Sequence, residues 1–240
     1  MRPNYLQLSP SQSSLSYKSP PFVSIHPNHR DLVVSFGQST FDCEGQEAQG
    51  EYFSRVIHWP GGNSGVTIGR GYDMGQRTRL QVISELKYAG VSIEDALYFA
   101  GGAGLRGERA KRYVESSLES SPALSLAAQR RLFETITTPE IISDIQRILS
   151  KPDLRAKYGN TSWEELTPLA REVVFDLRYR GDYTPETRTR VQPLLTAQDD
   201  RGLQALLNQR SYWQGLNVPL ARINARIEMA SKITEYRIAS

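Results

Sequence analysis

The hydrophobic positions that follow Gly75 recur at the spacing of three and four residues that is typical of amphipathic helices. Leu80, Ile83 and Leu86 begin this pattern, and Gly90 ends it. Ser92-Ile-Glu-Asp95 resembles a capping box that opens a short helix. Further helices are predicted near residues 106–118, 125–136, 139–149, 167–179, 186–195, 199–208 and 219–238, mostly with a proline near the start.

The pattern before Gly75 is different and predicts a small β-containing part. Residues 33–43 are expected to begin the folded part as a helix, which Glu44-Gly45 ends, because glycine accepts a left-handed conformation cheaply. Residues 51–59 are rich in aromatic and β-branched side chains and predict a strand. A turn at 60–65 and a second strand at 66–70 would complete a hairpin or small antiparallel sheet. The predicted fold class is therefore α+β, with a small β lobe followed by a larger helical lobe.

The first 34 residues are rich in serine, proline and asparagine, and they bury too little apolar surface to fold alone. We interpret 1–34 as an arm or linker and 35–240 as the folded domain. A docking or delivery segment, such as one that a secretion machine carries, is the alternative for 1–34.

Composition and charge exclude several classes of protein. The 29 Lys and Arg residues exceed the 26 Asp and Glu residues by too little to indicate a nucleic-acid binder, and they form no block. No stretch reaches the 18 apolar residues of a membrane span, and the N-terminus lacks the apolar run of a secretory signal. We therefore expect synthesis in the cytoplasm without a signal peptide. Cys43 is the single cysteine, and the histidines are not spaced as metal ligands, so neither a metal nor a cofactor is expected.

The candidate chemistry lies between Cys43 and Gly75. Hydrolysis of a glycosidic bond needs an acid that protonates the leaving oxygen and a second polar group that positions water or stabilises the transition state. Glu44 is placed to be the acid, at a helix end that faces the predicted sheet. Thr67 and Asp73 flank Gly69-Arg-Gly71, where a backbone without bulky side chains allows a polymer to approach closely.

These residues resemble a known family. Phage-type lysozymes carry Glu-Gly at the end of their first helix and Thr-Ile-Gly-x-Gly after a hairpin, as Glu44-Gly45 and Thr67–Gly71 do here. The closer likeness is to the pesticin-like muramidase domain of bacteriocins and secreted effectors, in which the segment continues as Tyr-Asp-x-Gly, here Tyr72 to Gly75. The phage enzymes place an aspartate between the glutamate and the threonine, whereas residues 45–66 contain none.

The resemblance implies a lysozyme-like fold and cleavage of the β-1,4 bond between N-acetylmuramic acid and N-acetylglucosamine in peptidoglycan. Glu44 would be the general acid and Thr67 would position water. Asp73 would be the second carboxylate, since the hairpin offers no aspartate. Residues 173–181 would form the central helix of the larger lobe, and Arg222 and Arg226 would lie on a lysozyme-like C-terminal helix.

Four further residues are predicted to bind substrate: His58, Trp59, Arg70 and Tyr72. His58 and Trp59 could stack on sugar, or pack within the small lobe. Arg178 and Arg180 could contact acidic peptide stems, although a salt-bridged helix face is the plainer interpretation. Cys43 is interpreted as a small buried hydrophobic residue and not as a nucleophile.

Three alternatives remain open. The muramidase would act in the periplasm or cell wall as an antibacterial toxin or effector with a periplasmic immunity protein, or as a phage endolysin. A lysozyme-fold module that binds cell wall without hydrolysis is a second hypothesis, and its mark would be the loss of the acid. A nucleic-acid-binding helical protein is a third, against which the scattered basic residues count.

Overall fold

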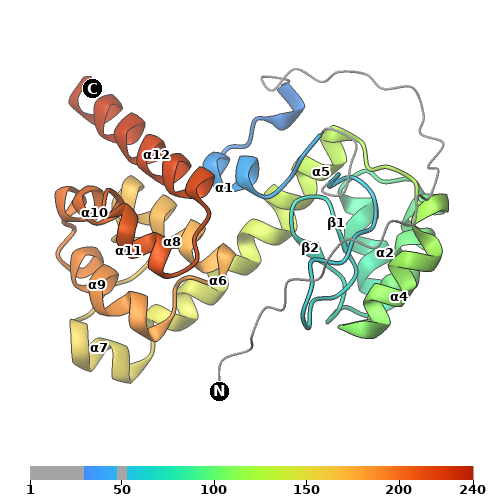
Figure 1. The fold of residues 1–240 in the computed structure, drawn as a ribbon, viewed down its shortest axis with the longest axis horizontal. Helices are drawn as coiled ribbons and strands as arrows, with labels where there is room; N and C mark the ends of the chain where they lie inside the picture. Colours follow the sequence, from blue (N-terminus) through green and yellow to red (C-terminus); the bar gives the residue numbers. More distant parts are fainter. Residues whose placement is uncertain (1–29, 48–52, 240) are drawn as a thin grey trace.

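The computed structural model describes residues 30–47 and 53–239 (Figure 1). A short helix η1 (Arg30–Leu32) leads into α1 (Gln38–Cys43), and a two-stranded antiparallel sheet follows, made of β1 (Thr67–Ile68) and β2 (Tyr72–Asp73). The rest is helical: α2 (Arg79–Tyr88), α3 (Ile93–Phe99), η2 (Ala100–Gly102), α4 (Glu108–Ser117), η3 (Leu118–Ser120), α5 (Leu126–Leu132), η4 (Phe133–Thr137), α6 (Thr138–Leu149), α7 (Pro152–Tyr158), α8 (Pro168–Arg180), α9 (Pro185–Thr196), α10 (Asp200–Leu207), α11 (Arg210–Gly215) and α12 (Leu220–Ala239). The predicted α+β class is confirmed at this level.

Two hydrophobic cores organise these elements. The first, here called the hairpin core, lies between the sheet and helices α2 to α5 and contains Ile57, Ile68 and Leu132. The second, here called the helical core, gathers α1 and the helices from α6 to α12 around Phe175 and Trp213. Figure 1 shows α1 between the sheet and helices α8 and α12. The boundary between 34 and 35 stays a prediction, because residues 1–29 lie outside the described residues.

One helical run joins the two cores. The sequence predicts a break before Pro139, but α5 continues through the π-helix η4 into α6, with Pro139 in the first turn of α6. Proline supplies no backbone N–H, and a π-turn absorbs such a gap without ending the helix. Leu132 packs in the hairpin core and Phe133 in the helical core, so the run changes core at this junction.

Several helices begin at a capping side chain, and one of these caps, Ser92, was predicted. Thr78 and Gln81 form a capping box on α2, and the hydroxyl of Ser92 accepts a hydrogen bond from the backbone N–H of Asp95 on α3. Gly90 follows α2 with a φ of +84°, as expected of a helix stop. The short helices α7 and α11 are absent from the sequence-based prediction.

The predicted strand over 51–59 is wrong for the residues that the structure describes, 53–59. They make only isolated bridges, between Gln46 and Phe53 and between His58 and Thr67. Their other backbone groups pair with the loop before α5: Ser121 Oγ accepts from the N–H of Ile57, and the carbonyl of Arg55 accepts from Leu124. Strand β1 pairs instead with β2, in the register Thr67 to Asp73 and Ile68 to Tyr72.

Gly45 follows the end of α1 for a different reason from the predicted one. Its φ is not positive. A Cβ at this position would lie 2.9 Å from both the Arg70 Cγ and the Ser54 Oγ, so glycine is required for close packing against the hairpin. Among the described residues, no helix is both long and apolar enough to cross a membrane.

Candidate active site

A cleft of about 810 Å³ lies where the end of α1 meets the hairpin and the start of α12. This volume is within the range of about 300–1,000 Å³ that ligand sites occupy. Residues far apart in the sequence line it: Asp42, Cys43, Glu44, Gly45, Gln46, Ser54, His58, Trp59, Pro60, Thr67, Gly71, Arg180, Pro219, Ala221 and Arg222. The structure thus brings Glu44 and Thr67, two residues predicted to be catalytic, into one cleft.

Glu44 is the residue that ends α1. Its backbone N–H donates to the carbonyl of Phe41 at 3.4 Å, and its side chain is 25% exposed. The Nη1 of Arg222, from α12, donates to its Oε1. This ion pair therefore fixes the direction of the Glu44 carboxyl group at the cleft.

Arg222 belongs to a chain of alternating charges that runs from the cleft into the helical core. The Nη2 of Arg222 donates to Asp176 Oδ1 at 2.6 Å, and the Nε of Arg226 donates to Asp176 Oδ2 at 2.5 Å. Arg226 Nη2 then reaches Asp182 Oδ2 at 2.6 Å, and Asp182 also pairs with Arg180. Three carboxylates alternate with three guanidinium groups, so the chain as a whole is neutral.

Burial and charge act in opposite directions within this chain. Burial raises the pKa of Asp176, but the guanidinium groups of Arg226 and Arg222 outweigh it and hold that pKa below its usual value of 3.8. Burial likewise lowers the pKa of Arg222, but the carboxylates of Asp176 and Glu44 raise it above its usual value overall. Both groups are therefore charged at neutral pH.

Thr67 occupies β1 and is almost fully buried. Its backbone pairs with His58, with N–H to O distances of 2.9 Å in both directions. Its Oγ1 donates to the carbonyl of Gly65 at 3.2 Å. The single hydroxyl proton is thereby used, and the oxygen lone pairs remain available to accept a hydrogen bond from a molecule in the cleft.

Asp73 faces Thr67 across the sheet but does not line the cleft. Its Oδ1 accepts from the backbone N–H of Gly75 at 2.6 Å and its Oδ2 from that of Gly65 at 3.0 Å. A Cβ on Gly65 would lie 2.1 Å from Asp73 Oδ1, so this glycine is needed for the contact. The structure therefore does not bring the Asp73 carboxylate together with Glu44, and both of its oxygens hold backbone groups of the hairpin.

His58 and Trp59, which were predicted to bind substrate, line the cleft. Burial lowers the pKa of His58 below its usual value of 6.5, so the ring is neutral at pH 7. Its Nδ1 lies 3.1 Å from the carbonyl oxygen of Val56. Because a carbonyl only accepts, the proton is on Nδ1 and the lone pair is on Nε2. The indole Nε1 of Trp59 is buried without a hydrogen-bond partner, and Lys111 lies over the ring at 5.8 Å.

The structure does not bring Arg70 and Tyr72 to the cleft. Arg70 is 5% exposed, donates to the carbonyl of Phe41 and to Glu47 Oε1, and lies 4.0 Å from the centre of the Phe41 ring. Tyr72 is 1% exposed, and its hydroxyl donates to Glu85 Oε2 at 2.6 Å. These two side chains connect the hairpin to α1 and α2 and do not line the site.

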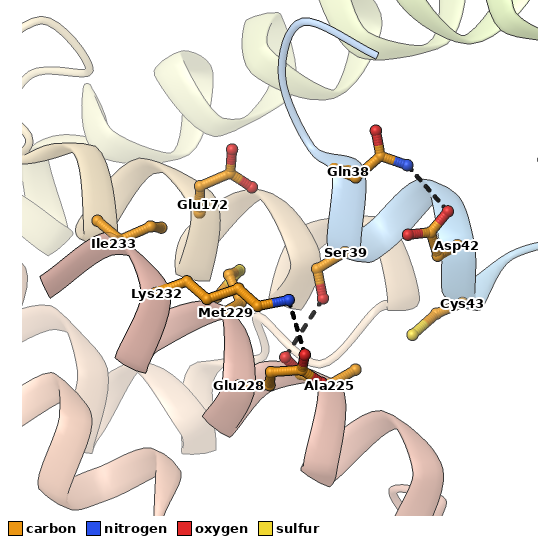
Figure 2. A pocket seen from close by; sticks show the side chains of 10 residues that line it. All are labelled: Gln38, Ser39, Asp42, Cys43, Glu172, Ala225, Glu228, Met229, Lys232 and Ile233. Atoms are coloured by element: carbon orange, nitrogen blue, oxygen red, sulfur yellow. Dashed lines mark hydrogen bonds and ion pairs between the residues drawn. The ribbon is translucent and has the colours of Figure 1, made fainter. Parts of the chain in front are cut away.

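A second pocket of about 430 Å³ lies beside the cleft, between α1, α8 and α12 (Figure 2). It shares Asp42 and Cys43 with the cleft. Burial raises the pKa of Asp42 and of Glu172 in its wall, while Lys232 pairs with Glu228 at 2.7 Å. Cys43 is exposed at the border between the two hollows, so the prediction that it is a buried hydrophobic residue is wrong.

Two residues of the site were not predicted as site residues: Arg222 and Asp176. A sequence signal existed for both. Asp176 interrupts the apolar run of α8, and Arg222 and Arg226 are four residues apart on one face of α12. Of the other arginines that were considered, Arg178 pairs with Asp144 away from the cleft, and Arg180 lines it. Within the described residues, no group of three or more His, Cys, Asp or Glu side chains could hold a metal ion.

Comparison with known proteins identifies a family for this chain. No curated protein matches it. A family model described as a domain of unknown function (DUF8812) matches residues 37–227, a range that contains both Glu44 and Arg222. Because this range covers more than half of the 240 residues, the chain belongs to the DUF8812 family.

Proposed function

We propose that this protein is a muramidase, a glycoside hydrolase that cleaves the β-1,4 bond between N-acetylmuramic acid and N-acetylglucosamine in peptidoglycan. The observation that carries the proposal is the meeting of Glu44 and Thr67 in one cleft, at positions that match the lysozyme motif. In this proposal the hairpin core and the helical core correspond to the small and large lobes of a lysozyme-like fold, with the substrate between them.

Glu44 acts as the general acid. Its carboxyl group donates a proton to the glycosidic oxygen as the bond to the anomeric carbon breaks, and positive charge develops on the sugar ring. Arg222 holds the carboxyl group in the direction of the cleft. Because both the acid and its partner extend from helical elements, the proton is delivered from a fixed position.

Thr67 positions the water. A water molecule that donates a hydrogen bond to the Thr67 Oγ1 keeps a lone pair free to attack the anomeric carbon. As the new bond to the anomeric carbon forms, the water loses a proton, and the Nε2 lone pair of neutral His58 in the same cleft can accept it. Asp73 contributes by fixing the backbone that carries Thr67, since its carboxylate binds the N–H groups of Gly65 and Gly75.

The setting is part of the proposal. A protein that cuts peptidoglycan acts in the periplasm or cell wall, and an antibacterial effector of this kind requires an immunity protein that fills the cleft. One route is delivery through a secretion machine by way of residues 1–34, and the other is release as a phage endolysin. Co-expression in the periplasm with neighbouring open reading frames would separate them, because only an effector needs a protective partner.

The direct test is Glu44→Gln, which keeps the size of the side chain and removes the acid. We expect the release of reducing ends from isolated peptidoglycan to fall by about 10²- to 10⁴-fold, the usual contribution of a general acid. Glu119→Gln, on the exposed surface of η3, is the matched control and should act as wild type.

Mass analysis of the released muropeptides gives the bond that is cut. An active Glu44→Gln protein would contradict the role of Glu44. Products that end at an amide bond would contradict the muramidase itself.

A further inference from the structure

Asp176 is a carboxylate in the interior of the helical core that no part of the proposed reaction yet uses. It is 2% exposed and lies on α8 within an apolar run. Its Oδ1 accepts from Thr40 Oγ1 at 3.0 Å and from Arg222 Nε at 3.1 Å, in addition to the bond from Arg222 Nη2. Its Oδ2 is held by Arg226.

A buried ion pair of this kind is costly to form. Removing charges from water costs several kcal/mol per ion, and well-packed apolar residues often replace such pairs without loss of stability. Stability is therefore a weak explanation for Asp176, and its position beside Arg222 requires another.

The guanidinium group of Arg222 pairs with two carboxylates, one buried and one accessible from the cleft. The side chain of Asp176 is 3% exposed and that of Glu44 is 25% exposed. Asp176 binds Nε and Nη2, which leaves Nη1 directed at Glu44. The buried side of the pair thus sets the orientation of the side that lines the cleft.

The acid of a glycosidase must carry a proton when it meets its substrate. A lone guanidinium group in contact with a carboxylate favours the ionised form. The other charged or titratable groups near Glu44 are Asp42 and Cys43 on α1, Asp176, Tyr179 and Arg180 on α8, and His58 and Arg70 beside the hairpin. Arg180 is matched by Asp182, Arg70 by Glu47, and His58 is neutral, so Asp176 is the carboxylate that directly neutralises Arg222 from its buried side.

We propose that Asp176 is a positioning residue of the reaction: it orients Arg222 and offsets its positive charge, so that Glu44 alternates between the carboxylate and the carboxylic acid. The inference rests on the proposed function of the cleft, and it names the group that regulates the protonation of the acid.

Asp176→Asn tests this role, because it keeps the shape of the side chain and removes its charge. Arg222 then has Glu44 as its one anionic partner, and a proton is harder to place on Glu44. We expect kcat to fall by about 10- to 100-fold with little change in KM, and the basic limb of the pH profile of kcat to move to lower pH. Asp144→Asn is the matched control, since Asp144 also pairs with an arginine of α8 but lies outside the cleft.

Cys43 provides a reporter that does not depend on turnover. Cys43 is exposed, but the protein still covers part of its surroundings. This partial desolvation raises the pKa of its thiol, Arg222 lowers it, and the charges of Asp176 and Glu44 raise it. Loss of the Asp176 charge should therefore lower the pKa of the thiol and speed its alkylation severalfold at a fixed pH near 8. Asp144→Asn should leave the alkylation rate unchanged.

The outcomes separate the two proposals. If wild type and Glu44→Gln release the same products at the same rate, the proposed acid fails, whatever Asp176 does. If Glu44→Gln is inactive while Asp176→Asn keeps the kcat, the pH profile and the thiol titration of wild type, the role of Asp176 is overturned. A loss of kcat with an unmoved pH profile and an unmoved thiol titration also overturns it, because that result describes a residue needed only for folding.

A second variant guards against misfolding of Asp176→Asn, which leaves two buried arginines with fewer partners. Asp182→Asn removes a charge one pair further from Glu44 along the chain of charges, where Asp182 binds Arg226 and the cleft residue Arg180. It should shift the pH profile and the thiol titration in the same direction by a smaller amount. No shift in a folded Asp182→Asn protein, judged by circular dichroism, counts against the proposal if Asp176→Asn does not fold.

Discussion

Asp73 shows how a single carboxylate can serve the site without lining it. Its carboxylate oxygens accept hydrogen bonds from the backbone N–H groups of Gly65 and Gly75, and its backbone carbonyl accepts one from the Arg77 side chain at 2.6 Å. Each bond fixes a part of the loop on either side of the sheet. The position of Thr67, its partner across the sheet, depends on these bonds.

Asp73→Asn should therefore act mainly on stability. An amide keeps one acceptor oxygen but turns an NH₂ group toward the second backbone N–H, so we expect the free energy of unfolding to fall by about 1–3 kcal/mol. Hydrolysis by the folded protein should stay within about tenfold of wild type, which is less than a lost general acid costs. Urea unfolding and muropeptide release measure the two effects.

The comparison with Glu44→Gln makes the result decisive. That variant should lose activity and keep most of its stability. A stable but inactive Asp73→Asn protein would restore Asp73 as a catalytic carboxylate.

Four residues that the sequence singled out share one cleft, and their catalytic and binding roles stay predictions. Glu44, Thr67, His58 and Trp59 all line the cleft. The motif did not show which face each side chain would occupy. Tyr72 is opposite Ile68, and both are in the hairpin core, which a motif without a register cannot reveal.

The ion-pair partners of Glu44 could not be predicted from the sequence for a further reason. Asp176 and Arg222 meet only when α8 packs against α12, and this packing depends on the whole helical core. Long-range pairing of this kind leaves no local signal except a charged residue in an apolar run.

At the scale of elements, the turn between β1 and β2 packs against α8 through Tyr179. Gly69 and Gly71 have φ values of +57° and +85°, and the hydroxyl of Tyr179 donates to the carbonyl of Arg70 at 2.6 Å. A Cβ on Gly71 would lie 1.8 Å from that hydroxyl oxygen. The turn therefore needs glycine at residue 71 both for its conformation and for the approach of Tyr179.

Gly71→Ala should be strongly destabilising. Gly181→Ala is a matched control, because Gly181 has a φ of +87° and a Cβ added there would meet nothing within 4 Å. Both variants carry the backbone strain of about 1–2 kcal/mol, and only Gly71→Ala adds the collision. The midpoint of thermal unfolding should fall further for Gly71→Ala than for Gly181→Ala.

Removing the Tyr179 hydroxyl should recover part of the lost thermal stability. Tyr179→Phe in the Gly71→Ala background deletes the hydroxyl oxygen, and we expect the double variant to unfold at a higher temperature than Gly71→Ala alone. Equal losses in Gly71→Ala and Gly181→Ala would show that the approach of Tyr179 is unimportant.

Helix α3 was predictable because the cap at Ser92 marks its start, and α2 because an apolar period runs to a glycine stop at Gly90. The short helices α7 and α11 were missed because seven and six residues hold too little periodicity to detect. The prediction of a strand over 53–59 was wrong because the β-forming residues of this segment pack against the loop before α5. A buried segment without strand partners can have the same composition as a strand.

At the scale of the whole molecule, carboxyl groups of two opposite kinds govern the response to acid: one is buried and paired with arginines, and the others are partly desolvated at the surface. The arginines hold the pKa of Asp176 below its usual value of 3.8. Burial raises the pKa of Asp42 above 3.8 and that of Glu172 above 4.5. The first kind stabilises the fold when ionised, and the second kind stabilises it when protonated.

These directions fix the sign of the pH dependence. Asp42 and Glu172 bind protons in the folded state first, so the free energy of unfolding should rise as pH falls from 7 toward their usual values. Asp176 binds protons in the unfolded state first, so its contribution is complete above 3.8 and is lost as pH falls through its lower folded value. A maximum at mildly acidic pH is expected, followed by a steep loss.

Urea unfolding between pH 7 and pH 3 measures this curve. Glu172→Gln should flatten the rise, because its side chain no longer titrates. A free energy of unfolding that does not change over the whole range would contradict the balance of the two kinds of carboxyl group.

The ion pair of Glu44 and Arg222 also has a consequence for the order in which the protein is made. Its members are 178 residues apart, and the buried residues of the hairpin core that the structure describes run from Ile57 to Leu132. On the ribosome the acid and the hairpin core emerge long before the arginine does. A nascent chain can thus complete the hairpin core while its cleft still lacks α12, and translation must pass Arg222 before the site is assembled.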